Sequence, residues 1–366
     1  MFAEPIKAAS ITTDRKQDEL AMKSIRKIGL TCALTLAGVA AVILAYLIFP
    51  GAPSKSKVMV FEGFIELPRK SALTVLDYLT LNDHALFVTS ESSGVLFKID
   101  FDSDDLRGST VSEMPGAGAA HGVALVPGLN VAFVTRSKAN TVDVFDPKSL
   151  RQLASIPVAD DADAILYLSL AKLIYVVHGD ANMATLIDPE KRVTVGSIPL
   201  PGKPEFPAID SESGLLFQNL EDTNEAAAID VSKRSVVGQW SLAPCEGPSG
   251  MAIDSVKRRL FAVCSGNAKL VVFDLEKRRV ITSLRIGGGP DSVAVDSGVH
   301  RIYTTGKAGD MTVIQQDGPD SYRVLDEIHT HYGAHTLTVD PLSHKVFVAY
   351  ASLLAHPRIA VFSPAQ

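Results

Sequence analysis

The sequence has 366 residues, of which 46% are hydrophobic, and its formal net charge is −6. This length and apolar content suffice for a large core within one domain. Residues 1–27 carry six basic and four acidic side chains and residues 28–49 carry no charge. The net charge of residues 1–49 is therefore +2, which leaves a net charge of −8 on residues 50–366. Because an acidic surface repels phosphate backbones, we expect no broad affinity for nucleic acid.

The first predicted element is a transmembrane helix at residues 28–49, a run of 22 residues without a charged, Asn or Gln side chain. Such a helix is about 33 Å long, enough to cross a hydrocarbon core of about 30 Å. A cleaved secretory signal is the alternative, but its apolar run is usually about 7–15 residues and is followed by a small-x-small site. We therefore expect an uncleaved, single-pass anchor.

The distribution of basic residues around this span predicts its orientation. Arg26 and Lys27 directly precede the span, whereas Lys55 and Lys57 lie farther beyond its end. The positive-inside rule then places residues 1–27 in the cytoplasm as a tail. Residues 50–57 read as a short linker, and residues 58–366 lie outside, in the periplasm or the extracellular space.

An internal repeat predicts the fold of the exported part. An aromatic residue within an apolar triplet recurs seven times, at steps of 46, 42, 42, 44, 42 and 44 residues. Each repeat contains four short β-rich runs separated by turn residues, which is the period of a propeller blade. We predict an all-β, seven-bladed β-propeller of four-stranded antiparallel blades at residues 58–366. The repeated aromatic residues are Phe87, Phe133, Tyr175, Phe217, Phe261, Tyr303 and Phe347.

The two ends of the repeat array predict how the ring closes. The seventh repeat reaches the chain terminus after only three strands, and an unmatched apolar strand, residues 58–67, precedes the first repeat. We expect this N-terminal strand to lie on the outside of the last blade and to complete it.

Several of these segments resemble a known repeat family. Phe87-Val-Thr and Phe133-Val-Thr are similar to the core of YVTN-type propeller repeats. The segments that begin at Cys264, Gly287 and Gly333 resemble the YncE-like branch of that family. The resemblance covers about residues 58–364, and it departs from the family pattern in blades six and seven, where an aspartate after the third strand is lost. It implies a seven-bladed, commonly exported propeller with a binding or scaffold role more often than a defined reaction.

The predicted blade geometry gathers polar residues at one end of the central channel. The loop that leads into the innermost strand and the loop between the second and third strands lie at the same end of every blade. Imidazole and carboxylate groups at that channel mouth could bind a divalent metal; the alternative is a set of solvated loops. The candidate metal ligands are His121, Asp163, His178, Glu205, His329, His331 and His335.

Other chemistries find little support in the sequence. There is no Gly-x-Ser-x-Gly elbow, no P-loop and no dinucleotide-binding fingerprint before a helix. We therefore predict no organic cofactor. The favoured function is a monomeric, membrane-anchored, extracytoplasmic binding module whose ligand is an unknown protein or small molecule. The alternative is a metal-assisted lactonase- or lyase-like enzyme with its site at the channel mouth.

The cysteines leave one question open. Cys32 lies within the predicted membrane span, whereas Cys245 and Cys264 form an even pair in the exported part, where disulfides persist. Counting back from the hairpin at residues 254–259 pairs Cys264 near Ser249, four residues from Cys245. A bridge therefore requires the intervening loop to curl, and the sequence does not decide whether it forms.

Overall fold

A computed structural model describes residues 35, 38–39, 51–70, 74–82, 85–101, 106–116, 118–350 and 356–365. The chain divides into two compact units, Met1–Phe49 and Pro50–Gln366. The cytoplasmic tail and the transmembrane helix predicted at residues 28–49 lie outside the described residues, apart from helical Thr35, Gly38 and Val39. Among the residues that are described, no helix is long and apolar enough to cross a membrane. The anchor therefore stays a prediction.

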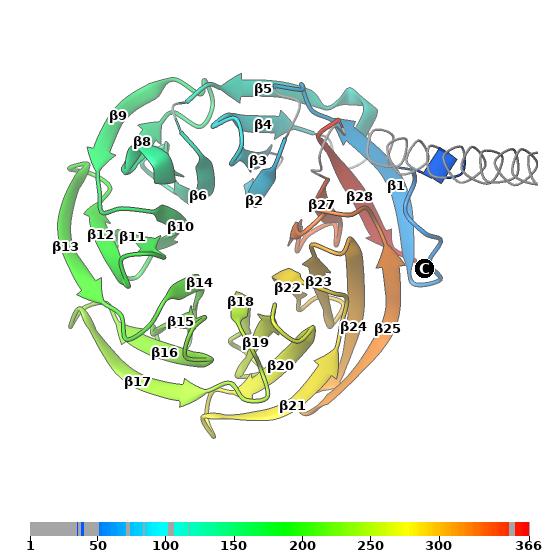
Figure 1. Cartoon of the computed structure of the whole chain (residues 1–366). Coiled ribbons are helices and arrows are strands. Elements are labelled where there is room, and N and C mark those ends of the chain that lie inside the picture. Colours follow the sequence, from blue (N-terminus) through cyan, green and yellow to red (C-terminus); the bar gives the residue numbers. More distant parts are fainter. Residues whose placement is uncertain are drawn as a thin grey trace, which may run out of the picture. The chain divides into compact units, whose positions relative to one another are not determined.

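The described part of the second unit forms seven four-stranded antiparallel sheets arranged in a ring (Figure 1). This confirms the predicted all-β seven-bladed propeller. Blades one to three contain β2 (Leu76–Asn82), β3 (Ala85–Ser90), β4 (Leu96–Asp100), β5 (Thr110–Met114); β6 (Ala120–Val126), β7 (Val131–Arg136), β8 (Thr141–Phe145), β9 (Gln152–Pro157); and β10 (Ala162–Leu168), β11 (Leu173–His178), β12 (Met183–Asp188), β13 (Val193–Pro199).

Blades four to seven continue the same order of innermost to outermost strand. They contain β14 (Pro204–Ile209), β15 (Leu216–Leu220), β16 (Glu225–Asp230), β17 (Ser235–Ser241); β18 (Pro248–Asp254), β19 (Arg259–Cys264), β20 (Lys269–Asp274), β21 (Arg279–Arg285); β22 (Pro290–Asp296), β23 (Arg301–Gly306), β24 (Asp310–Gly318), β25 (Ser321–His329); and β26 (Thr336–Val339), β27 (Val346–Tyr350), β28 (Arg358–Pro364) with β1 (Met59–Glu66). Short 3₁₀ turns occur at Leu106–Gly108 and Ser137–Ala139.

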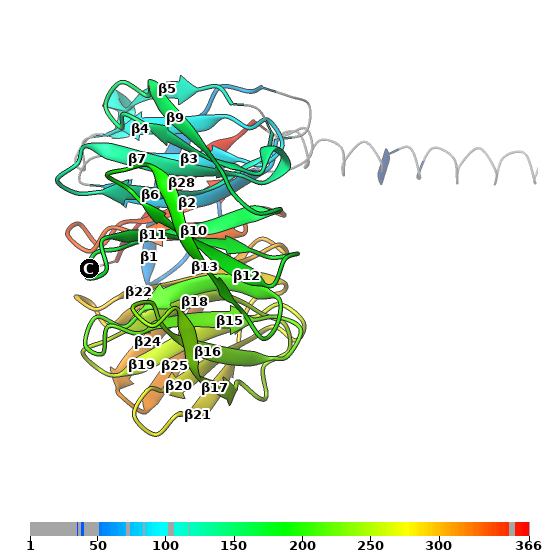
Figure 2. The same cartoon turned by 90° about the vertical axis from the view of Figure 1, so that its left-hand side faces the viewer.

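The core lies between neighbouring blades, which pack face to face around the ring (Figures 1 and 2). The second strands are buried along nearly their whole length, as in β7 and β19. Both faces of these strands contact apolar side chains. In β11, Val176 packs in one cluster with Val144 of the preceding blade, and Val177 packs in another with Leu220 of the following blade. Strands buried on both faces read as continuous hydrophobic runs, which explains the recurring apolar triplets of the sequence. The outermost strand β17 alternates half-buried and exposed residues because one of its faces meets solvent.

The N-terminal strand closes the ring as predicted. β1 pairs antiparallel with β28, with Ile65 opposite Ile359, and completes the sheet β1-β28-β27-β26. Ile65 is 4% exposed and lies in a core cluster with Ile359 and Phe347. The last blade therefore joins residues from the two ends of the described propeller.

The aspartates at the ends of the third strands have a structural role. Oδ1 of Asp146 accepts hydrogen bonds from the backbone N–H groups of Lys148 and Ser149, at 2.8 and 3.0 Å. Asp188 and Asp274 make the same pair of bonds in their own blades. These carboxylates fix hairpin turns at the end of the propeller opposite the channel mouth, so they are not candidates for catalysis.

Candidate functional site

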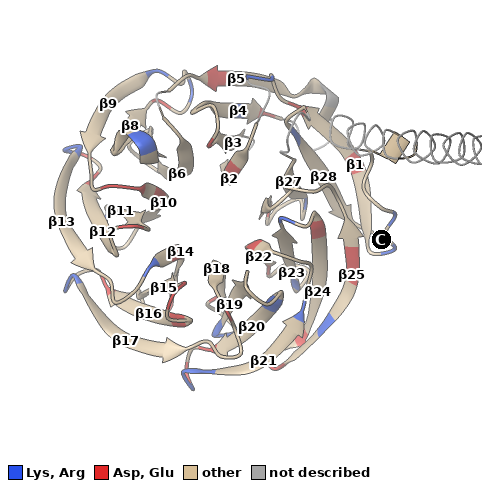
Figure 3. Ribbon diagram, viewed as in Figure 1, with Lys and Arg blue, Asp and Glu red and all other residues tan. Residues whose placement is uncertain are grey.

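One position of the repeat brings polar residues from every blade to the channel mouth. It is the second residue of the innermost strand in six blades and the residue just before β26 in the seventh. Figure 3 shows acidic segments on β2, β10 and β22 facing the centre of the ring. Six of the seven residues are ionisable and half-buried, and we call them the channel ring: Asp77, His121, Asp163, Glu205, Asp291 and His335.

The backbone of the innermost strands explains how one position is aimed into the channel. In β2, β6, β10, β14, β18 and β22 the pairing with the second strand shifts register at this point, for example between Ala162 and Ile165. An irregularity of this kind bends the strand and re-aims the side chains beside it. Its repetition around the ring makes this position a property of the fold.

His121 contacts the ring residues on both sides of it. Its Nδ1 lies 2.5 Å from Oδ2 of Asp77 in blade one and 3.4 Å from Oδ1 of Asp163 in blade three. Its Nε2 lies 2.9 Å from the hydroxyl of Ser137. Both ring nitrogens of this histidine therefore have partners, and three successive blades are joined through one imidazole.

The other half of the channel ring is less tightly connected. Nε2 of His335 lies 3.7 Å from Asp291, whose second cationic neighbour, Lys307, is 3.9 Å away and mostly exposed. Lys203 lies 3.5 Å from Glu205 but is closer, at 2.6 Å, to Glu221. These cations neutralise the ring carboxylates only in part.

The pKa values of the channel ring reflect this crowding of carboxylates. Burial, together with the charge of Asp77, raises the pKa of Asp163 to about 7 although His121 opposes the shift. Burial and the charges of Asp163 and Glu221 raise the pKa of Glu205 to about 8, against the charge of Lys203. Burial also raises the pKa of Asp291. A cation that binds beside such a carboxyl group stabilises its ionised form.

The same carboxylates favour the charged form of His121. Burial lowers the pKa of its imidazole, but the hydrogen bond to Asp77 and the charges of Asp77 and Asp163 outweigh burial and raise the pKa to about 9. The imidazolium form thus partly offsets the carboxylates at neutral pH.

Two aromatic side chains that neighbour channel-ring residues in sequence lie close to each other. Tyr78 of blade one and Phe206 of blade four each follow a ring residue, and their ring centroids are 5.2 Å apart. Burial, and then the charges of all four ring carboxylates, raise the pKa of Tyr78 well above its usual value. Both side chains line a mainly apolar cavity of about 300 Å³, together with residues of other innermost strands that include Val123 and Val339.

The backbone of the channel ring is fixed by side chains from neighbouring blades. Thr135 of β7 donates from Oγ1 to the carbonyl of Asp163, at 2.6 Å. The Nδ2 of Asn219 and the Oγ1 of Thr305 donate in the same way to the carbonyls of Ser249 and His335, each at 2.8 Å. Each donor lies on the second strand of one blade, and each acceptor lies on, or directly before, the innermost strand of the next blade. The ring is therefore positioned before any ligand binds.

The structure places only part of the predicted ligand set in the channel. His121, Asp163, Glu205 and His335 belong to the channel ring. His178 ends β11 and is buried beneath the mouth, with its nitrogens 3.0 Å from the carbonyl of Asp160 and 2.8 Å from the hydroxyl of Thr185.

The remaining two candidates lie away from the axis. His329 ends the outermost strand β25, where its Nδ1 is 2.9 Å from Asp310 and its side chain is half exposed. His331 is buried against Tyr350, with ring centroids 6.0 Å apart. Neither of these two residues is part of the channel ring.

Two ionisable residues of the channel ring are missing from the predicted ligand set, Asp291 and Asp77. Asp77 is the first residue of the ring along the chain. It lies 44 residues before His121, and the ring positions that follow are spaced by 42, 42, 44, 42 and 44 residues. The same spacing separates the repeated aromatic residues from Phe133 onward, and a step of 44 residues back from His121, one of the two recurring steps, reaches Asp77.

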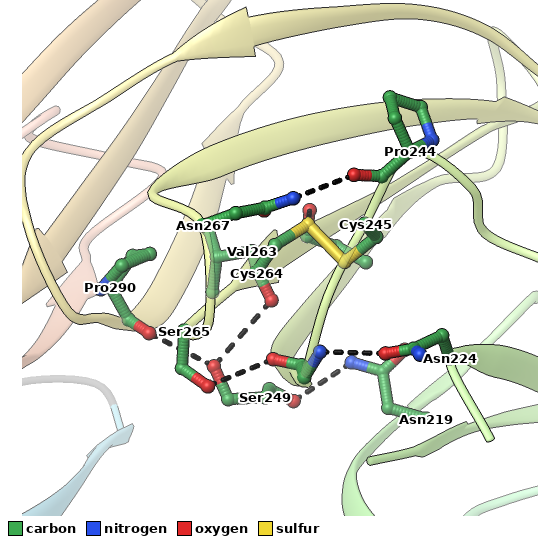
Figure 4. The surroundings of a disulfide bond; sticks show 12 residues. Asn219, Asn224, Pro244, Cys245, Ser249, Val263, Cys264, Ser265, Asn267 and Pro290 are labelled. Atoms are coloured by element: carbon green, nitrogen blue, oxygen red, sulfur yellow. Dashed lines mark hydrogen bonds between the residues drawn. A yellow bond between two sulfur atoms is a disulfide. The ribbon is translucent and has the colours of Figure 1, made fainter. Parts of the chain in front are cut away.

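Blade five has Ser249 at the ring position, and a disulfide lies beside it (Figure 4). Cys245 and Cys264 are bridged, with Cα atoms 5.3 Å apart and both residues buried. The backbone N–H of Cys245 donates to the carbonyl of Leu242, and this turn curls the loop so that the two sulfurs meet. The bridge left open by the sequence is therefore present, and it holds the loop leading into blade five.

The fold and this site define a seven-bladed β-propeller with a carboxylate-rich channel mouth. No protein-family model matches the sequence, and no curated protein matches it. Among solved structures, a chain of Kuenenia stuttgartiensis hydrazine synthase is similar, with a TM-score of 0.67 and 15% sequence identity. The match covers 83% of this chain and 96% of that chain. At this identity the similarity establishes the shared propeller fold alone.

Proposed function

We propose that this protein is a membrane-anchored, extracytoplasmic binding module that captures a positively charged ligand at its channel mouth. The observation that carries the proposal is the channel ring, in which four carboxylates from four blades converge with only two histidines and two peripheral lysines. A low-dielectric cleft lined by one sign of charge concentrates ligands of the opposite sign.

The sequence supports the location of the module. The uncharged run at residues 28–49 and the basic residues before it favour an anchored propeller outside the cytoplasm. The resemblance to YVTN-type repeats favours the same assignment, because that family is commonly exported. We assign the chain to this repeat type as part of the proposal.

The binding proposal is tested with hexaamminecobalt(III), a trivalent cation whose charge does not change with pH and whose ligands do not exchange. We expect the full-length protein in detergent micelles to bind it, measured by isothermal titration calorimetry at low salt, and to bind it more weakly as salt screens the charges. The double variant Glu205→Gln with Asp291→Asn should weaken binding at least about tenfold.

A matched control separates the channel ring from net charge. Glu190→Gln with Glu276→Gln removes the same two charges from exposed turns at the opposite end of the propeller. This control should bind as the unmodified protein does. Equal weakening in both double variants, or no binding by the unmodified protein, would show that the channel mouth is not a cation site.

A metal-assisted lactonase- or lyase-like enzyme is the second candidate. The close approach of Asp77, His121 and Asp163 favours it, since imidazole and carboxylates at an open channel mouth are a ligand set used in catalysis. Hydrolysis of a simple lactone such as γ-butyrolactone by the protein with Mn²⁺, abolished by His121→Ala, would favour the enzyme. Ligand binding without turnover would favour the binding module.

A further inference from the structure

We infer that Asp77, His121 and Asp163 form a binding site for a borderline divalent transition-metal ion such as Zn²⁺, Mn²⁺ or Co²⁺. This inference rests on the proposed cation-binding function of the channel ring, and it names one chemical class of cation and the side chains that hold it. The site is formed by three successive blades, β2, β6 and β10, at the channel mouth.

The first argument is the geometry of the three ligand atoms. Among the described residues, this is the one group of three or more His, Cys, Asp or Glu side chains whose ligand atoms all lie within 4.8 Å of one another. The sequence has 41 acidic residues and 9 histidines, so proximity of this kind is selective.

The distances suit a small ion after a minor adjustment. Ligands about 2.1 Å from a tetrahedral ion lie about 3.4 Å apart. Nδ1 of His121 is already 3.4 Å from Oδ1 of Asp163 and only 2.5 Å from Oδ2 of Asp77. Replacing the shared proton by a metal ion would require the second distance to open by about 0.9 Å, which rotation of the carboxylate can supply.

The second argument lies outside the cluster, at the far nitrogen of His121. Nε2 is 2.9 Å from the hydroxyl of Ser137, which follows β7. Histidines that bind metals usually hold their second nitrogen in such a contact, because it fixes the ring and the tautomer. With Nε2 engaged by Ser137, Nδ1 faces both carboxylates as the available ligand atom.

The third argument is rigidity. Thr135 accepts from the backbone N–H of Gly122 at 2.9 Å and donates to the carbonyl of Asp163 at 2.6 Å. Thr336 donates to the carbonyl of Asp77 at 2.7 Å. The backbone next to every proposed ligand is thus hydrogen-bonded to another strand, which is the preorganisation that a metal site requires.

The chemistry of the donors selects the class of ion. One imidazole nitrogen with two carboxylate oxygens suits borderline divalent ions better than the all-oxygen ions Ca²⁺ and Mg²⁺. Three protein ligands leave at least one coordination position for a further ligand. Glu205 and Asp291 are the other two carboxylates of the channel ring. A second ligand entering the mouth would meet the metal at that position.

The experiment uses full-length protein in detergent micelles, freed of metal with a chelator and then titrated with Co²⁺. We expect one ion per chain by calorimetry and a visible d–d absorption band from Co²⁺ bound through imidazole and carboxylate. His121→Ala and Asp163→Asn should each abolish the band and lower the affinity at least about 100-fold. Ser137→Ala, which acts through His121, should lower it about 10–100-fold.

His329→Ala is the matched control, because His329 also lies 2.9 Å from an aspartate but does not belong to the one group of three such ligands found among the described residues. It should leave the Co²⁺ affinity and band unchanged. Far-UV circular dichroism and the melting temperature establish that each variant is folded, and Asp163→Asn preserves side-chain volume if His121→Ala does not fold.

The outcomes separate this inference from the proposed function. If hexaamminecobalt(III) binds but Co²⁺ produces no stoichiometric band, the metal site is refuted and the cation-binding module stands. If Co²⁺ binds equally well to His121→Ala and Asp163→Asn, the ion lies elsewhere and the inference is refuted. If neither cation binds, both proposals fall.

Discussion

The closure of the ring by β1 makes a quantitative prediction for a single side chain. Ile65 is 4% exposed and packs against Phe347, Ile359 and Val361 in the last blade. Replacing it with alanine removes buried methyl and methylene groups and leaves a cavity, which costs about 2–5 kcal/mol. That is a large share of the roughly 5–15 kcal/mol by which domains are stable. At about 2–4 °C per kcal/mol, the melting temperature should fall by at least about 4 °C.

The control lies in the same strand. Val60 is 50% exposed, so Val60→Ala should change the free energy of unfolding by less than about 1 kcal/mol. Both variants are compared with the unmodified full-length protein by differential scanning calorimetry. Equal melting temperatures for Ile65→Ala and Val60→Ala would show that the N-terminal strand does not carry the closing contacts.

Three further predictions concern the disulfide, the channel ring and the topology. Denatured, unreduced protein should show one reactive thiol per chain, from Cys32, and three after reduction. Three reactive thiols before reduction would contradict the Cys245–Cys264 bridge, which should stabilise the fold by about 3 kcal/mol through the loop that it closes. Because the pKa of Glu205 is raised to about 8, this carboxyl gains its charge as pH rises, so hexaamminecobalt(III) should bind more tightly at pH 9 than at pH 6.5. Glu205→Gln should reduce that increase; an unchanged pH profile would refute the role of Glu205. Protease added outside intact cells or spheroplasts should digest residues 50–366 and spare the N-terminal tail, whereas full protection of the propeller would refute the predicted orientation.

The fold was predictable because every blade repeats the same burial pattern. Apolar second strands are sandwiched between blades, so each repeat carries the same signal, and seven copies reinforce one another. The closing strand was predictable for a related reason, since the last repeat lacks a strand and the first is preceded by one.

The candidate site was only partly predictable, because adjacency in sequence is a poor guide to distance from the axis. His329 and His335 are six residues apart, yet the chain between them crosses from the outermost strand of blade six to the innermost strand of blade seven. In a four-stranded blade the outermost and innermost strands are three inter-strand spacings of about 4.8 Å apart. His178 lies at the correct end of the propeller, but as the last residue of a second strand it is opposite Ala162 and buried.

Ring closure and the channel ring are physically linked through the last blade. β26 lies at the inner edge of the sheet that β1 completes, and Thr336 of β26 donates a hydrogen bond to the carbonyl of Asp77 in blade one. Loosening β1 should therefore disturb the position of Asp77 before the other blades unfold, because each of those blades is complete within itself. In Ile65→Ala we expect Co²⁺ binding to be lost on heating several degrees before the far-UV circular dichroism changes. In Val60→Ala the two transitions should coincide. Coincident transitions in Ile65→Ala as well would show that the propeller unfolds as one cooperative unit and that the last blade has no separate control over the site.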